Sequence, residues 1–300
     1  MGALLALLIF PGGLFVLLNG WAYEWVDRKL VARLQSRVGP RWFQPAADTL
    51  KLLAKEEIVP DGVDARLFGG LPLVALAAAL TAALYVPLAG VGPTFSFAGD
   101  LVVTVALLSV PTICAGLAGV NTTDRFALVG AARALTQLFS YEAPFLLALL
   151  GPALAAGSWR VEAIVAYAGG RWLALSQPIG FAVALLGLMG KLELPPFDAP
   201  EAETEIVAGA LTEYSGRGLA LFRLARAVAL VVGLTLIGAL YLGGLASPAA
   251  YLAKTLALLL ALACIQALFA RLRIDQTSGL WWRAGALLVL AQWLWLVVER

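Results

Sequence analysis

Long apolar runs occupy most of this chain and constrain its fold more than any other feature. A helix needs about 20 apolar residues to cross the hydrocarbon core of a bilayer. Eight segments approach or reach that length: Ala3–Tyr23, Leu67–Ala89, Leu101–Val120, Ala134–Ala156, Gln177–Leu192, Leu219–Leu242, Tyr251–Phe269 and Leu280–Val298. Only 13% of the residues are charged, whereas soluble domains carry roughly 25%. The sequence therefore predicts an all-α polytopic membrane protein with about eight transmembrane helices, forming one membrane domain over residues 1–300.

Basic residues are distributed unevenly between the predicted loops. Most of the 21 lysines and arginines fall in the odd-numbered loops, and only Arg160, Arg171 and Lys254 fall in even-numbered ones. Because cytoplasmic loops carry the excess of positive charge, we expect the odd loops to face the cytoplasm and both termini to face outside. The first apolar run lacks a preceding basic region and an A-x-A cleavage site, so it is predicted to remain as a span of the cytoplasmic (inner) membrane.

Residues that usually bind redox centres are scarce. The chain has no histidine, and its two cysteines, Cys114 and Cys264, lie in separate apolar runs. Zinc, haem and iron–sulfur sites need such ligands in clusters, so we expect this chain to bind no metal or cofactor by itself. A net charge of +2 without a polybasic tail gives no support for nucleic-acid binding.

The first predicted cytoplasmic segment, residues 24–57, has an amphipathic pattern. Lys29, Arg33 and Arg37 follow one another at a spacing of four beside a stripe formed by Leu30 and Leu34, which predicts an extension of the first helix. The Gly-Pro pair at residues 39–40 should end this extension, and residues 44–57 should form a second amphipathic helix. Such helices either rest on lipid headgroups or border a cavity at the membrane surface, and both arrangements fit the pattern.

The loop between the fifth and sixth runs, residues 193–217, concentrates negative charge. Five of the 19 acidic residues fall in its first part: Glu193, Asp198, Glu201, Glu203 and Glu205. Asp198 and Glu201 match a capping box, which is a structural role. On a helix, however, Asp198, Glu201 and Glu205 share one face while Glu203 points away. Like charges on one face repel, so either cations neutralise them or some carboxylates hold protons near neutral pH.

Further acids extend this candidate site. Glu142 is a lone carboxylate in the fourth predicted span, near its cytoplasmic end, where a charged group is functional by default. Glu213 would lie on the same side as Glu205 if one helix ran through both. Glu193 and Lys191 end the fifth span, and each could pair with neighbours of the other.

The segment that joins the last two runs carries Arg271, Arg273 and Asp275. These residues either anchor the positive side of the membrane with a local salt bridge, which contributes little if exposed, or supply counter-charges for the acidic loop.

Several of these motifs occur in an order that resembles a known family. They are Gly39-Pro40 followed by Gln44-Pro45, Lys51-Leu52-Leu53-Ala54-Lys55-Glu56, Ser140-Tyr141-Glu142, Pro196-Phe197-Asp198-Ala199-Pro200-Glu201-Ala202-Glu203, Glu213-Tyr214-Ser215-Gly216 and Arg271-Leu272-Arg273-Ile274-Asp275-Gln276. Over nearly the whole chain, this pattern resembles the NADH dehydrogenase subunit 1 family, whose members are the H-subunits of respiratory complex I. It is most similar to the branch of membrane-bound, energy-converting (group 4) hydrogenases.

The resemblance implies a membrane subunit that joins a hydrophilic electron-transfer arm to ion-pumping membrane subunits. Iron–sulfur clusters, and in a hydrogenase a NiFe centre, would belong to partners on the cytoplasmic side, and quinone is a possible ligand. The implied proton-relay or coupling residues are Glu142, Glu193, Asp198, Glu201, Glu203, Glu205 and Glu213. The implied chamber or arm contacts are Arg28, Arg33, Arg37, Phe197, Arg217, Arg271, Arg273 and Asp275.

Two departures from the complex I pattern favour the hydrogenase-type branch. The stretch between Gly39-Pro40 and Gln44-Pro45 is contracted, and Leu194 stands where an arginine is common. Alternatives from other classes are a quinone-chamber subunit of NADH-quinone oxidoreductase proper, a stand-alone secondary transporter, and a passive membrane anchor. The lack of a visible internal repeat disfavours the transporter, and a carboxylate inside a span disfavours the anchor.

Overall fold

Five long apolar helices form the body of the protein. The computed structural model describes residues 8–298, and within that range the only β-structure is an isolated bridge between Leu88 and Val91. The helices that are long and apolar enough to cross a membrane are α4 (Ala65–Ala83), α5 (Asp100–Val120), α6 (Arg125–Ala156), α11 (Gly216–Tyr241) and α12 (Pro248–Leu268). They confirm the predicted all-helical membrane fold.

Over the described residues, the helices at the other three predicted spans do not meet the length and apolarity needed to cross a membrane as single helices. Helix α2 (Gly13–Leu34) begins within the first apolar run, of which residues 3–7 lie outside the described part, and it continues into the charged segment. Helix α9 (Pro178–Lys191) has only 14 residues. The last run is one helical stretch that starts early, as α13 (Ile274–Leu280), a π-helical segment η2 (Trp281–Gly285) and α14 (Ala286–Val298).

Polar residues at the helix ends explain where several helices start. Asp64 and Asp124 precede α4 and α6, and their carboxylates accept hydrogen bonds from the first backbone N–H groups. Ser247 caps α12 in the same way, with Pro248 at the first helical position. Each such cap contributes about 1 kcal/mol by satisfying an N–H group that lacks a helical partner.

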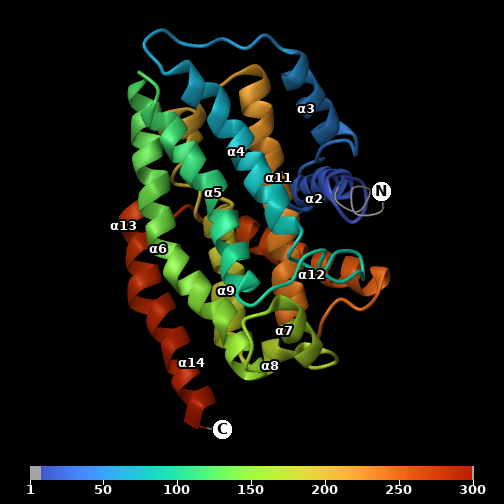
Figure 1. Ribbon diagram of the computed structural model, residues 1–300. Helices are drawn as coiled ribbons and strands as arrows, with labels where there is room; N and C mark the ends of the chain where they lie inside the picture. The colour runs from blue at the N-terminus through green and yellow to red at the C-terminus, as the bar shows by residue number, and fades with distance from the viewer. Residues whose placement is uncertain (1–7, 299–300) are drawn as a thin grey trace.

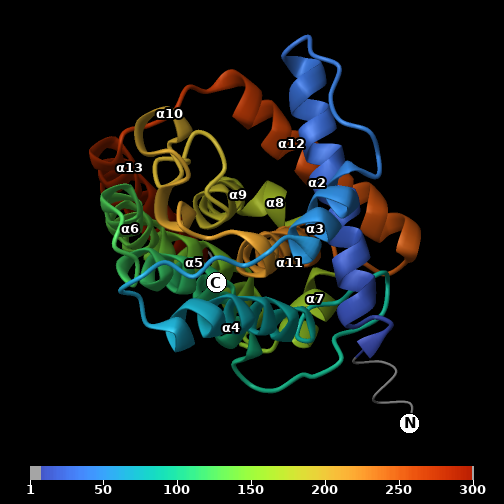
Figure 2. The same ribbon diagram turned by 90° about the horizontal axis from the view of Figure 1, so that it is seen from above.

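Helix α11 lies at the centre of the bundle. It packs against α4, α2, α12 and α9, and the view from above shows it surrounded by them (Figure 2). Helices α4, α5 and α6 run side by side along the long direction of the molecule (Figure 1). Figure 2 looks along the axis of α6, and in that view α2 and α12 are seen along their length. These two helices therefore cross the bundle obliquely (Figures 1 and 2).

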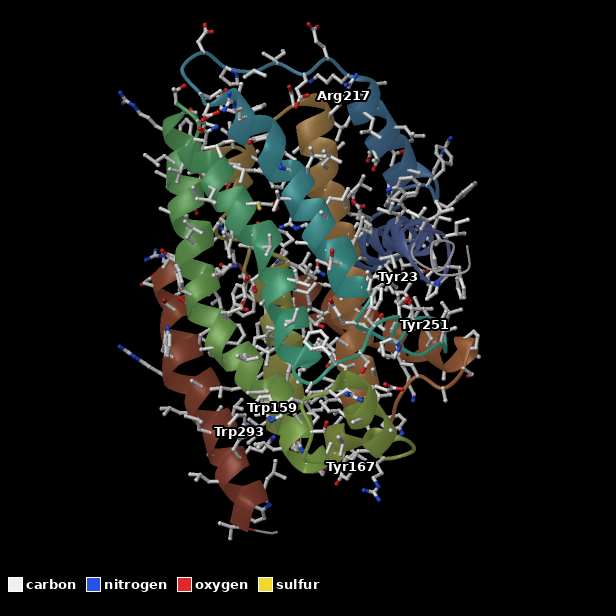
Figure 3. The ribbon with its side chains drawn as sticks, viewed as in Figure 1. Tyr23, Trp159, Tyr167, Arg217, Tyr251 and Trp293 are labelled. Carbon is white, nitrogen blue, oxygen red and sulfur yellow. The ribbon has the colours of Figure 1, made fainter. Side chains whose placement is uncertain are left out.

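Polar side chains join the two oblique helices. Asn19 Nδ2 donates to Tyr251 Oη over 3.2 Å, and the hydroxyls of Tyr23 and Thr255 lie 2.6 Å apart. Tyr23 and Tyr251 lie close together between α2 and α12 (Figure 3). Because a hydroxyl inside an apolar bundle must find a partner, these pairs fix how α2 sits on α12.

Short elements fill the two ends of the bundle. At the end that carries Arg217, the first loop contains α3 (Gln44–Ala54), and residues 35–43 before it are not helical. At the opposite end, near Trp159 and Tyr167, lie α7 (Val161–Ala168) and α8 (Leu173–Ser176) (Figure 3). The acidic loop contains only α10 (Glu203–Ile206) and the 3-10 turn η1 (Gly209–Leu211).

Candidate buried charge site

The acidic loop does not form the helix that the charge spacing suggested. Residues 199–201 form turns, α10 has four residues, and it ends before Val207, which has a φ of +63°. Three prolines, at 195, 196 and 200, remove backbone donors that a continuous helix would need. The prediction that Asp198, Glu201, Glu205 and Glu213 share one helical face is therefore wrong, because these acids take separate positions in the loop.

One arginine from the central helix holds two of the loop acids. Arg226 on α11 lies 3.2 Å from the Glu193 carboxylate through Nη2, and its Nη1 forms an ion pair with Glu201. Its Nε donates to the Leu192 carbonyl over 2.7 Å. We call Arg226, Glu193 and Glu201 the arginine cluster. One guanidinium faces two carboxylates, so the cluster carries a net negative charge when both acids are ionised.

That charge imbalance affects protonation. Burial raises the pKa of Glu193 to about 7; the neighbouring Glu201 carboxylate also raises it, and Arg226 opposes both effects. A buried carboxyl with a pKa near neutrality can gain and lose a proton under physiological conditions. Of the two alternatives for the loop acids, neutralisation by cations applies to Asp198, Glu201 and Glu205, which pair with arginines, while Glu193 is the acid whose pKa burial raises.

A second ion pair lies deeper in the bundle, with Lys191 buried and Glu142 partly buried. Lys191, the last residue of α9, places its Nζ 2.8 Å from Glu142 Oε2 on α6 and 2.5 Å from the Ser109 hydroxyl on α5. Ser109 Oγ lies 2.6 Å from Glu142 Oε1. We call Lys191, Glu142 and Ser109 the lysine site. Because α6 begins at Arg125, Glu142 lies near the middle of that helix, and not near its end as the predicted span implied.

A cavity of about 440 Å³ connects the two groups. Its wall includes Lys191, both acids of the arginine cluster and Arg226 itself, together with apolar side chains of α5 and α11. Helix α2 contributes Glu24, Asp27 and Arg28, and α11 contributes Arg223. The size and the mixed lining are typical of sites for small molecules.

Several of these wall residues were not among the predicted site residues. Arg223 and Arg226 were counted only as positive charge on a cytoplasmic loop, and Glu24 and Asp27 only as part of an amphipathic segment. Asp27 accepts a hydrogen bond from Gln266 Nε2 over 2.9 Å. The one available signal was the proximity of Glu24, Asp27 and Arg28 to an apolar run, because charge next to a span often marks a polar interior.

The other loop acids face different partners. Arg271 binds Asp198 through two nitrogens, at 2.9 Å and 2.5 Å, so Arg271 does supply a counter-charge to the loop. Glu205 pairs with Arg133 over 2.7 Å at an exposed position. The side chain of Glu203 lies outside the described part of the structure.

The remaining predicted residues do not line the cavity. Phe197 is buried, and its ring centroid lies 5.3 Å from that of Trp281. Glu213 is half-buried next to Tyr214, which does line the cavity. The exposed members are Arg33, Arg37, Arg217, Arg273 and Asp275. Among the described residues, no group of three or more His, Cys, Asp or Glu side chains is arranged to hold a metal ion.

The fold and the site together define a class: an integral membrane protein whose interior holds ionisable groups around a cavity. Comparisons with known proteins narrow this class. The family model described as NADH dehydrogenase matches residues 5–297. The NADH-quinone oxidoreductase H-subunit of Thermomicrobium roseum is 36% identical over 299 residues, which cover 89% of this chain and 88% of the relative. Its counterpart in Carboxydothermus hydrogenoformans is 34% identical over 240 residues, covering 78% and 69%.

A solved structure resembles the whole fold. A chain of the membrane-bound sulfane sulfur reductase, an archaeal respiratory membrane complex, aligns with a TM-score of 0.85 and 26% identity over 97% of this chain and 98% of that chain. The present chain therefore belongs to the NADH dehydrogenase subunit 1 family, as the order of its motifs indicated.

Proposed function

We propose that this chain is the membrane subunit of a complex I-related, redox-driven ion pump. It anchors a hydrophilic electron-transfer arm at the end that carries the first loop and the acidic loop. It couples the redox reaction of that arm to movement of H⁺ or Na⁺ through partner membrane subunits. In this proposal eight helical spans cross the cytoplasmic membrane, those loops face the cytoplasm, both termini face outside, and iron–sulfur clusters belong to the partners.

One observation carries the proposal: a cavity reaches from the acidic loop to a buried ion pair in the middle of the bundle. Its wall holds Glu193, whose pKa burial raises to about 7, and also Lys191, whose ammonium pairs with Glu142. A change in charge on one wall residue alters the proton affinities of the other ionisable wall residues, because charges interact strongly where water is scarce. A passive membrane anchor would not require ionisable side chains around an internal cavity.

The hydrogenase-type branch remains our preferred form of the complex. It is supported by the contracted segment between Gly39-Pro40 and Gln44-Pro45 and by Leu194, which lies in the cavity wall. A specific observation also favours the second candidate, a quinone-chamber subunit. The cavity of about 440 Å³ has apolar side chains of α5 and α11 beside charged ones, which suits an amphipathic acceptor, and both relatives above carry the name of NADH-quinone oxidoreductase.

Substitution of Glu142 tests the coupling. In membranes containing the assembled complex, Glu142→Gln should leave electron transfer by the arm largely intact and abolish the ion gradient that it drives. Glu162→Gln provides the matched control, because Glu162 is exposed on α7 at the opposite end. A Glu142→Gln complex that pumps at the rate of the unchanged protein would refute the coupling role.

A bulky side chain in the cavity distinguishes the two branches. Ala115→Trp on α5 should fill part of the cavity, because Ala115 belongs to its wall. If a quinone enters, reduction of added quinone should fall severely while electron transfer to a soluble artificial acceptor continues. If reduction of protons or of sulfur compounds in the arm is the natural reaction, that activity should survive the substitution.

A further inference from the structure

Three buried side chains at the seam between α6 and the C-terminal helical stretch (α13, η2 and α14) carry polar atoms without hydrogen-bond partners. They are Gln137 on α6, Thr277 on α13 and Trp281 at the start of η2, which we call the seam site. Each is at most 1% exposed. Among the described residues, no side-chain or backbone group bonds to Gln137 Oε1, Thr277 Oγ1 or Trp281 Nε1. Nearly all buried polar groups in folded proteins have a partner, because an unpaired one is costly.

Thr277 and Trp281 face α6. The backbone N–H of Trp281 donates to the Thr277 carbonyl, and residues four positions apart share one face of a helix. That face packs on α6: the ring centroids of Trp281 and Tyr141 lie 6.5 Å apart, and the hydroxyl oxygens of Ser278 and Ser140 lie 2.7 Å apart. Both polar atoms therefore belong to the seam between the two helices.

Gln137 reaches the same place from α6, one helical turn before Tyr141. Its Nε2 donates to the carbonyls of Gly190 and Phe197, over 3.0 Å and 2.7 Å. Only the NH₂ end of an amide can donate, so these two bonds fix the orientation of the side chain and leave Oε1 as the free acceptor. The Phe197 ring in turn lies 5.3 Å from the Trp281 ring. One network of contacts thus joins all three members of the seam site.

We propose that the seam site binds an internal water molecule. The hydroxyl of Thr277 and the indole N–H of Trp281 donate, and Gln137 Oε1 accepts. A water molecule matches this set, because its oxygen can accept two hydrogen bonds while one of its protons is donated. Buried waters typically make about three hydrogen bonds to groups that lack other partners. The three members carry no charge and offer few oxygen ligands, which does not suit a metal cation.

The bound water gives the C-terminal stretch a polar connection to the acidic loop. It holds the Gln137 amide at Oε1, and the other end of the same amide holds the Phe197 carbonyl at the start of that loop. Trp281 begins the π-helical segment η2, and such irregular turns are frequent at functional sites. This inference goes beyond the proposed function and does not rest on it, because a water site requires neither electron transfer nor pumping.

X-ray footprinting of the purified complex detects such a water directly. Hydroxyl radicals formed from a bound water oxidise the side chains beside it, even where bulk solvent does not reach. After correction for intrinsic reactivity, Trp281 should be oxidised several-fold faster than Phe68, which is buried to the same extent. Equal rates for Trp281 and Phe68 in the unchanged complex would overturn the proposal, and this comparison needs no variant that has to fold.

Removal of one donor supplies a second test. Thr277→Val keeps the shape of the side chain and deletes its hydroxyl, so Trp281 oxidation should fall several-fold. Thr104→Val is the matched control, because the buried Thr104 hydroxyl already donates to the Asp100 carbonyl over 2.7 Å. It should leave Trp281 oxidation unchanged. Oxidation of Trp281 that is equal in both variants would contradict the role of Thr277.

Thermal unfolding of the same variants distinguishes a hydrated site from a dry one by the sign of the change. In a dry site the Thr277 hydroxyl is buried without a partner, and its replacement by a methyl group should stabilise the protein or leave it unchanged. In a hydrated site the same replacement removes a hydrogen bond of the water, so the melting temperature of Thr277→Val should fall by a few degrees below that of Thr104→Val. A rise, or no difference, would show that the seam site holds no water.

Discussion

At the scale of single residues, Arg226 explains how an acidic loop can fold against an apolar bundle. Two carboxylates and a carbonyl from the loop meet its guanidinium, whose planar fork of donors suits such a task. The lysine site shows the same principle deeper inside, because the buried ammonium of Lys191 is paired with the partly buried carboxylate of Glu142. Neither partnership could be seen in the sequence, since the paired residues are separated by 33, 25 and 49 positions.

Loss of Arg226 should destabilise the protein more than loss of an exposed arginine. Arg226→Leu leaves two carboxylates without a counter-charge, and removal of one partner of a buried pair costs about 3–5 kcal/mol. Because the Arg226 side chain is 35% and that of Glu201 42% exposed, solvent screens part of this effect and we expect about 1–3 kcal/mol. Thermal unfolding of the purified complex measures the effect, with Arg217→Leu as the exposed control. Equal melting temperatures for the two variants would contradict the role given to Arg226.

Protonation of Glu193 should make stability depend on pH. Its pKa is raised from 4.5 to about 7 in the folded protein, so the folded state binds a proton that the unfolded state releases between those values. The stabilisation is therefore fully present below pH 4.5 and is lost as the pH rises to 7. At about 1.4 kcal/mol for each pKa unit, the total is about 3 kcal/mol. Melting temperatures across this range should fall more steeply for the unchanged protein than for Glu193→Gln; parallel curves would contradict the shift.

At the scale of elements, the sequence predicted the helices that apolar length alone determines. Helices α4, α5, α6, α11 and α12 follow from the bilayer thickness, because backbone groups inside lipid must pair within the helix. The acidic loop was predicted poorly, since three prolines and its tertiary partners outweigh the local capping signals. A cavity was predicted only as one of two alternatives for the first charged segment. Most of its wall could not be predicted, because it combines α2, α5, α9 and α11, whose packing the hydropathy pattern does not encode.

The acidic loop packs against α6 at Gly130, where the two backbones approach closely. A Cβ atom added at Gly130 would lie 2.5 Å from the carbonyl carbon of Gly209, and a backbone atom cannot move aside as a flexible side chain can. Gly130→Ala should therefore displace residues 203–212 and cost about 1–3 kcal/mol. Amide hydrogen exchange in this segment should rise. Gly69→Ala on α4 is the control, because an added Cβ there meets nothing within 4 Å. Unchanged exchange in Gly130→Ala would show that the loop is held by other contacts.

At the scale of the whole molecule, charge divides the bundle into two unequal ends. Arg217 is exposed at the end with α3 and the acidic loop (Figure 3), and most of the lysines and arginines fall in the odd-numbered predicted loops, which include these two segments. The other end, with α7 and α8, presents Trp159, Tyr167 and Trp172 at its surface. Basic loops remain on the cytoplasmic side while tryptophan and tyrosine favour the membrane interface. The acidic loop, whose Glu193 and Glu201 belong to the cavity wall, thus lies at the end where we place the electron-transfer arm.

Labelling from each side of the membrane tests this orientation. Both native cysteines are first removed as Cys114→Ala and Cys264→Ala, and Arg217→Cys or Tyr167→Cys is then introduced at opposite ends (Figure 3). After the peripheral subunits are washed off, an impermeant thiol reagent should label Arg217→Cys only in inside-out vesicles and Tyr167→Cys only in right-side-out vesicles. The reverse pattern would place the acidic loop outside the cell, where no cytoplasmic electron carrier could reach it. The cytoplasmic arm and the acidic loop would in that case lie on opposite sides of the membrane. The coupling proposal would then fail as a whole, whatever the single-residue variants show.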